Sequence, residues 1–201
     1  MKFAKFFALA AAVLALAACD DPQKDDEKWT EVAMKTIRAY AGDYIMVSAQ
    51  FSMPIALAPD AAPGTDVIRQ AEQFGWLGFQ SSNDRRAWDA NRIEDPSAPT
   101  RYMRVDLAVP FPDGAPGKSV YPGHCCIEAS TYHVVFQVGP DGSISPDHLL
   151  RSFTQGTGGK LENIDVRIQS DRIYFEADGK YYDWSTSSWK EEHLFIEYCR
   201  G

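Results

Sequence analysis

Apolar and polar residues alternate along much of the chain after residue 40, a period of two that is typical of β-strands burying one face. Residues 44–53, 130–138, 164–168 and 173–177 follow this pattern. The clearest stretch is residues 102–111, whose apolar side is Met103, Val105, Leu107, Val109 and Phe111. Because turn-forming residues separate these segments, we expect each strand to pair with its neighbour in sequence.

The turn signals set the expected topology. Residues 139–142, 170–171 and 185–188 are rich in turn-forming residues, and Asp178-Gly179 is a strong signal for a type I′ hairpin. Short strands joined by local turns predict a mainly β fold, an antiparallel up-and-down barrel or sandwich. The length suits a single globular domain over residues 28–201.

Two helices are expected beside the strands. Apolar residues recur at helical spacing over Glu27–Tyr40, with Asp26 placed to cap the start and Gly42 to end the helix. A short second helix is expected between Thr65, as its N-cap, and Gly75.

The N-terminus has the parts of an export signal. Lys2 and Lys5 flank the start of an apolar run that ends at Ala18, which is shorter than the about 20 residues that cross a bilayer. Leu16-Ala17-Ala18-Cys19 resembles the lipobox of bacterial lipoproteins. The resemblance implies removal of residues 1–18, a diacylglyceryl group on the thiol of Cys19, and acylation of the freed amine by a fatty acid such as palmitate. Two or three acyl chains anchor a protein stably.

The segment after the anchor is polar and acidic, so residues 19–27 are expected to be a disordered tether. Asp20 directly after the cysteine resembles the inner-membrane retention signal of enteric bacteria. Residues 23–27 resemble the acidic export tag of surface lipoproteins in another Gram-negative group. These patterns place the protein in the cell envelope, at the outer membrane with surface exposure, or alternatively at the inner membrane facing the periplasm.

The charge balance limits the partners. The full chain has 20 basic and 28 acidic residues, and loss of Lys2 and Lys5 with the signal peptide changes the net charge from −8 to −10. Nucleic acid and anionic lipid are both bound through basic side chains, so an acidic surface opposes them. We therefore expect no nucleic-acid partner, and membrane contact only through the N-terminal lipid.

A second resemblance spans much of residues 42–200. Gly42-Asp43-Tyr44 opens the first strand, and Tyr181-Tyr182-Asp183-Trp184, Trp189 and Tyr198-Cys199-Arg200 lie near the C-terminus. Together they resemble the lipocalin-like lipoproteins of bacterial envelopes. That family implies a small β-barrel after a lipid anchor, in most cases without an assigned activity. Tyr44 stands where the family often has the Trp of a Gly-X-Trp motif.

The remaining cysteines are candidates for a disulfide, because the envelope is oxidising. Cys199 is able to pair with Cys125 or Cys126, and a vicinal Cys125–Cys126 bridge is a further option. Each scheme leaves one thiol over. His124-Cys125-Cys126 carries good metal ligands, but neighbouring strand residues point to opposite faces, so we expect no metal site.

The sequence names no catalytic residue and no cofactor. It lacks the Gly-x-Ser-x-Gly nucleophile motif, and the glycine-rich residues 156–160 lack the spacing of a phosphate-binding loop. His133 is expected to be a hydrogen-bonded residue on a strand, and His148 and His193 to be solvated near turns.

The aromatic content is the remaining functional signal, with 5 Trp, 9 Tyr and 11 Phe. Core and cross-strand packing explains many such residues. The alternative is a ligand cup, a sugar-stacking surface or a partner surface, with Tyr132, Tyr174, Tyr182 and Trp184 as candidates. The leading hypothesis is a non-enzymatic binding module for a small apolar ligand, a glycan or a protein partner. A structural or interaction subunit of an envelope complex, and a hydrolase with an unrecognised site, are the alternatives.

Overall fold

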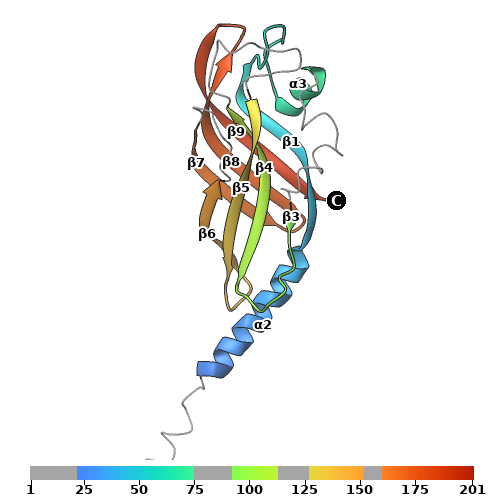
Figure 1. Cartoon of the computed structure of the whole chain (residues 1–201), viewed down its shortest axis with the longest axis vertical. Coiled ribbons are helices and arrows are strands. Elements are labelled where there is room, and N and C mark those ends of the chain that lie inside the picture. The colour runs from blue at the N-terminus through green and yellow to red at the C-terminus, as the bar shows by residue number, and fades with distance from the viewer. Residues whose placement is uncertain (1–21, 75–91, 113–126, 152–159) are drawn as a thin grey trace, which may run out of the picture.

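The computed structural model describes residues 22–74, 92–112, 127–151 and 160–201. These residues form a mainly β, antiparallel and nearly closed barrel with two helices, which confirms the predicted fold class (Figure 1). The elements in chain order are α2 (Pro22–Tyr40), β1 (Gly42–Ile55), β2 (Gly64–Asp66), α3 (Val67–Phe74), β3 (Arg92–Ile93), β4 (Tyr102–Pro112), β5 (Ile127–Val138), β6 (Ile144–Arg151), β7 (Leu161–Gln169), β8 (Arg172–Asp183) and β9 (Ser188–Arg200).

Strand β1 joins the two halves of the barrel. The strand order is β6-β5-β4-β3-β1-β9-β8-β7, with β2 paired to β1 off this path. On one side β1 meets the short strand β3, and on the other it pairs with β9 from Tyr44↔Arg200 to Phe51↔Leu194. Strands β6 and β7 end the order and approach each other, so the barrel is nearly closed.

Large side chains fill the barrel interior. Along β8 and β9 every second residue is buried, as the alternation predicts. Two buried tyrosines reach across to β4: the hydroxyl of Tyr198 donates to the carbonyl of Ala108 at 2.5 Å, and that of Tyr181 to the carbonyl of Pro110 at 3.3 Å. Burial raises the pKa of Tyr198 well above its ordinary value, so this hydroxyl remains a donor.

Helix α2 packs against one end of the barrel. It begins at Pro22, earlier than expected, so residues 22–27 of the predicted disordered tether are helical. Proline is favoured at the first helical position, and Asp25 in the first turn suits the helix dipole. Ala33 and Ile37 are fully buried against the barrel. None of the helices in the described residues has the length and apolar character to cross a membrane.

Two local predictions are wrong. Asp178 and Gly179 do not form a hairpin, because β8 runs through them and the turn lies between Asp183 and Ser188. Gly179 instead faces inward, where a Cβ atom would lie 2.8 Å from the Leu161 side chain. The short helix is capped by Asp66, whose carboxylate accepts from the Arg69 amide at 2.9 Å, and not by the residue before it.

Candidate functional site

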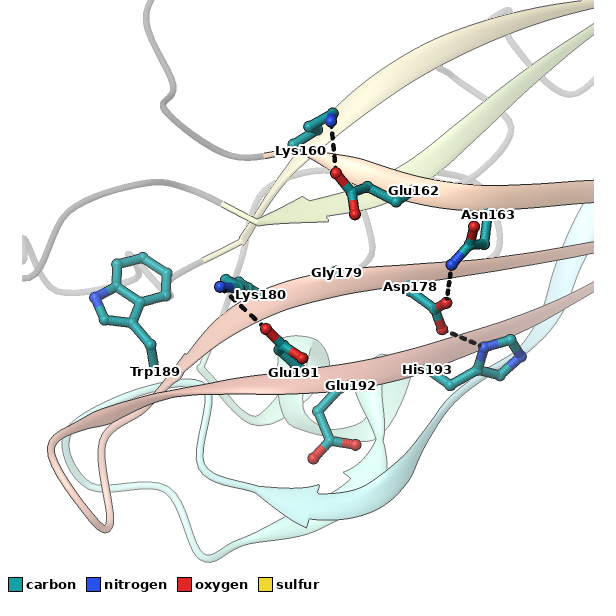
Figure 2. Close-up of a pocket in the computed structure, with 10 residues that line it drawn as sticks. All are labelled: Lys160, Glu162, Asn163, Asp178, Gly179, Lys180, Trp189, Glu191, Glu192 and His193. Carbon is teal, nitrogen blue, oxygen red and sulfur yellow. Dashed lines mark hydrogen bonds and ion pairs between the residues drawn. The ribbon is translucent and has the colours of Figure 1, made fainter.

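An open groove of about 930 Å³ crosses the start of β7, the end of β8 and the start of β9 (Figure 2). We call it the β7–β9 groove. All of its side chains except Trp189 are polar or charged, apart from a glycine. Among the described residues its lining is Lys160, Glu162, Asn163, Asp178, Gly179, Lys180, Trp189, Glu191, Glu192 and His193.

A hydrogen-bonded relay of three side chains spans the three strands of the groove. The amide of Asn163 donates to one oxygen of Asp178 at 2.7 Å, and Nδ1 of His193 lies 2.8 Å from the other oxygen. Hydrogen bonds from Asn163 and then His193 hold the pKa of Asp178 below its ordinary value. Nε2 of His193 lies 3.5 Å from Glu176. The relay therefore presents an ionised carboxylate and an oriented imidazole along the groove.

Two exposed ion pairs flank the relay. Lys180 lies 3.0 Å from Glu191 on the neighbouring strand, and Lys160 contacts Glu162 two residues along β7. The contact with Lys160 lowers the pKa of Glu162 below its ordinary value. Exposed pairs of this kind contribute little to stability. A polar ligand is therefore able to replace one partner of such an ion pair at a small cost in free energy.

An aromatic cluster lies at the hairpin end of the groove. The ring of Tyr182 packs edge-to-face against Trp184 at 5.1 Å between centroids and against Trp189 at 5.6 Å. Tyr182 and Trp189 are also opposite each other in the β8–β9 register. The side chain of Trp189 remains 43% exposed, so it is a fixed aromatic surface beside polar groups (Figure 2).

A buried carboxylate holds the hairpin that carries these aromatics. Asp183 accepts hydrogen bonds from the main chain and side chain of Ser185, from Thr186 and from the amide of Ala56, and its other contact is Lys190 at 2.7 Å. Burial by itself raises the pKa of Asp183, but the bonds led by Lys190 outweigh it and hold the pKa far below the ordinary value. Asp183 thus ties the β8–β9 turn to the loop after β1.

Two more buried polar side chains fix the same end of the barrel. Glu192 accepts from the Ser52 hydroxyl at 2.8 Å and from the Met53 amide at 3.0 Å. Gln70, from α3, accepts from the amide of Leu57 and donates to the carbonyls of Ile55, at the end of β1, and Gly64, at the start of β2. The main chain around the aromatic cluster is consequently held by side-chain hydrogen bonds.

The structure separates the four predicted ligand aromatics. Tyr182 and Trp184 lie together in the cluster at the groove. Tyr174 is on the same strand, half-buried, with its ring 6.3 Å from Phe195. Tyr132 is 98% buried in the interior, with its ring 5.6 Å from Phe175, so it belongs to the core.

Trp189, Asn163, Asp178 and His193 were not among the site residues predicted from the sequence. His193, expected near a turn in solvent, is half-buried on β9 and bonded to Asp178. His193 lies opposite Asp178 in the β8–β9 register, and Asn163 lies where the β7–β8 register shifts, between Glu162 and Asp165; alternation alone gives neither position. The closeness of Trp189 to Tyr182 and Trp184 in the sequence was the one signal available.

The other candidate reactive side chains that the structure describes do not line the groove. His133 lies 2.6 Å from Asp106 on the neighbouring strand, as expected for a hydrogen-bonded strand histidine. Ser187 and Lys190 have the Ser-x-x-Lys spacing of a nucleophilic serine and its lysine in β-lactamase-type enzymes. The ammonium of Lys190, however, contacts Asp183. Over the described ranges, no group of three or more His, Cys, Asp or Glu side chains is placed to hold a metal.

The predicted lipidation and disulfide residues are only partly described. Cys19, Cys125, Cys126 and the neighbouring His124 lie outside the described residues. Cys199 is a half-buried free thiol, with Sγ 3.9 Å from Asp171. The disulfide remains a prediction, which the intact mass of the exported protein with and without reductant would test.

Comparison of the chain with protein-family models, with curated proteins and with solved structures finds no match. The functional information therefore comes from the fold and the β7–β9 groove.

Proposed function

We propose that this protein is a lipid-anchored lipoprotein of the cell envelope whose barrel is a non-enzymatic glycan-binding module, with the β7–β9 groove as the binding site. The observation that carries the proposal is the exposed ring of Trp189, fixed by Tyr182 beside a groove of hydrogen-bonding side chains.

The chemistry of the groove suits a sugar chain. A glycan ring has an apolar C–H face that packs on an indole, and hydroxyl groups that need both donors and acceptors around the edge. Asn163, Asp178 and His193 supply both kinds of group along the groove. Its volume of about 930 Å³ falls in the range of ligand sites in proteins.

The alternatives from the sequence fit less well. A small apolar ligand needs an apolar cavity, but Phe136, Phe175, Tyr181 and Tyr198 fill the described interior. A protein partner commonly buries a large apolar patch. The groove instead has one exposed aromatic among paired charges.

Direct titration tests the binding proposal. The exported protein is titrated with short neutral, amino-sugar and acidic oligosaccharides while tryptophan fluorescence and amide NMR shifts are recorded. We expect binding by at least one class, shifts confined to the groove strands, and no hydrolysis of the oligosaccharide. Binding by none of the three classes would contradict the proposal.

A matched pair of variants locates the site. Trp189→Ala is expected to weaken binding at least tenfold, because about 1.4 kcal/mol of stacking is lost. Tyr102→Ala removes an aromatic side chain of similar exposure, 49%, on β4. It is expected to leave the Kd unchanged, and equal losses in both variants would place the ligand elsewhere.

The location is tested independently. We propose anchoring at the outer membrane with surface exposure. Mass spectrometry of the mature N-terminal peptide should find Cys19 acylated, and Cys19→Ser should release the protein from membranes. Protease treatment of intact cells distinguishes surface exposure from a periplasmic orientation, and membrane separation distinguishes the outer from the inner membrane.

A further inference from the structure

Helix α2 is fastened to the barrel by a group of contacts that we call the clasp. The indole of Trp29 donates to the carbonyl of Val138 at 2.7 Å, and the guanidinium of Arg101 lies 4.1 Å above the same ring. Arg101 also donates to Thr30 at 3.1 Å and contacts the carboxylate of Asp26 at 3.0 Å. Trp29 thus attaches the helix to the barrel through both the edge and the face of its ring.

The C-terminal end of α2 is fastened as well. Arg200, at the end of β9, donates to the carbonyls of Ala39 and Ala41 at 2.8 and 2.6 Å. The hydroxyl of Tyr44 donates to the carbonyl of Tyr40 at 2.8 Å. With Ile37 buried between these points, the helix has little freedom to pivot on the barrel.

The clasped helix leaves only a short link to the proposed anchor. Cys19 and Pro22 are three residues apart, so their Cα atoms are separated by about 11 Å at most. The helix itself has 19 residues and a length of about 28 Å. The helix therefore begins within about 11 Å of the proposed anchor and meets the barrel from Asp26 onward.

The membrane-proximal turns of α2 are unsuited to lying on a bilayer. Residues 23–28, Gln-Lys-Asp-Asp-Glu-Lys, are all exposed and all polar. A helix that lies in the bilayer interface needs an apolar face. The apolar face of α2 begins at Trp29, and the barrel covers it at Ala33 and Ile37.

The groove lies at the opposite end of the molecule. Figure 1 shows α2 extending from one end of the barrel, and the β8–β9 turn and α3 at the other. The β7–β9 groove uses the ends of strands that meet near this turn. We infer that α2 is a rigid stalk that presents the groove at the membrane-distal end, so that the ligand is a glycan chain beyond the headgroups of the protein's own bilayer. The orientation rests on the proposed anchor, and the identity of the ligand rests on the proposed glycan site.

Energy transfer to the bilayer tests the orientation. The full lipidated chain is placed in vesicles of phosphatidylethanolamine and phosphatidylglycerol that contain an acceptor-labelled lipid. A small fluorescent amino acid is introduced at Lys24, near the anchor, or at Glu191, in the groove. We expect strong transfer from position 24 and at least fivefold weaker transfer from position 191. Equal transfer from both positions would overturn the stalk.

The clasp variant and its control sharpen the result. Arg101→Ala should raise transfer from position 191, because the barrel then tilts toward the bilayer. Arg101→Lys should do so less, because the ammonium keeps the charge beside Trp29. Arg104→Ala removes an exposed arginine of β4 whose side chain pairs with Asp106. It should leave the energy transfer from position 191 unchanged. Unchanged transfer in Arg101→Ala would show that the clasp does not set the orientation.

The outcomes separate this inference from the proposed function. An unacylated Cys19 overturns the anchor and the stalk together. Acylated protein with equal transfer overturns the stalk alone. Correct orientation without oligosaccharide binding leaves the stalk standing and overturns the glycan assignment of the groove.

Discussion

The two ends of the barrel are fixed by different kinds of contact. At the α2 end the buried side chains, Ala33 and Ile37, are apolar, and the hydrogen bonds of Trp29, Arg101 and Arg200 are part-buried or exposed. At the hairpin end, the buried side chains of Asp183, Glu192 and Gln70 hold main-chain amides at the end of β1 and at the start of the loop that follows it. Hydrogen bonds between buried polar groups are costly to break, so they fix the main chain in one position. The end of the barrel that carries the groove is the one where polar side chains are buried in this way.

The largest effect is expected at the apolar end. Ile37→Ala removes a fully buried side chain and leaves a cavity, which lowers the free energy of unfolding by about 3–4 kcal/mol. Urea denaturation at neutral pH measures it. Val47→Ala, at a side chain that is 51% exposed, is the control and should cost about 0.5 kcal/mol or less. Similar costs for both variants would mean that α2 is not packed as described.

A smaller loss is expected at the polar end. Asp183→Asn places an amide donor among groups that already donate, so the free energy of unfolding falls by about 2–3 kcal/mol. Asp165→Asn is matched in chemistry but removes an exposed partner of Arg167, and should cost under about 0.5 kcal/mol. If the two variants cost the same, the hydrogen bonds to Asp183 do not hold the hairpin.

The contribution of Asp183 has a predictable dependence on pH. Its folded pKa lies below that of the unfolded chain, so its stabilisation is fully present above the unfolded value of about 3.9 and is lost as the pH falls toward the folded pKa. The difference in unfolding free energy between wild type and Asp183→Asn should be constant from pH 8 to 5 and shrink below about pH 4. Urea titrations across this range measure it, and a difference that grows in acid would reverse the assigned sign.

The smallest effect on stability is expected at the groove itself. Trp189→Ala removes an exposed ring and should change the free energy of unfolding by about 0.5 kcal/mol or less, although it weakens glycan binding. A loss above about 2 kcal/mol would make Trp189 a structural residue of the hairpin and remove it as a binding surface.

Alternation was sufficient to predict most of the barrel. Residues 102–111 gave β4 nearly to its ends, because Met103, Val105, Leu107 and Val109 are buried while Tyr102 and Arg104 on the other face are exposed. It failed at Asp178-Gly179, where the pair is typical of a hairpin but the strand continues. Gly179 is there because Leu161 and Tyr181 leave no room for a Cβ atom, a contact between strands that a local signal does not contain.

The residues of the groove could not be predicted from the sequence for a related reason. Asn163, Asp178 and His193 come from three strands. The β8–β9 register places His193 opposite Asp178, and Asn163 lies where the β7–β8 register shifts, between Glu162 and Asp165. A shift by one residue would turn His193 to the other face of the sheet. The aromatic cluster was partly accessible, because Tyr182 and Trp184 were selected while Trp189, five residues further along the chain, was not.

The pairing of β1 with β9 has a consequence for how the chain acquires its structure. Tyr44, near the start of the domain, pairs with Arg200, next to the last residue. The β4–β5 and β7–β8–β9 hairpins form from neighbours in sequence, but this contact closes a loop of nearly the whole domain, and such long-range closure slows folding. Strand β1 is synthesised before β9 and has no β9 partner until β9 has left the ribosome, so the barrel remains incompletely folded until then.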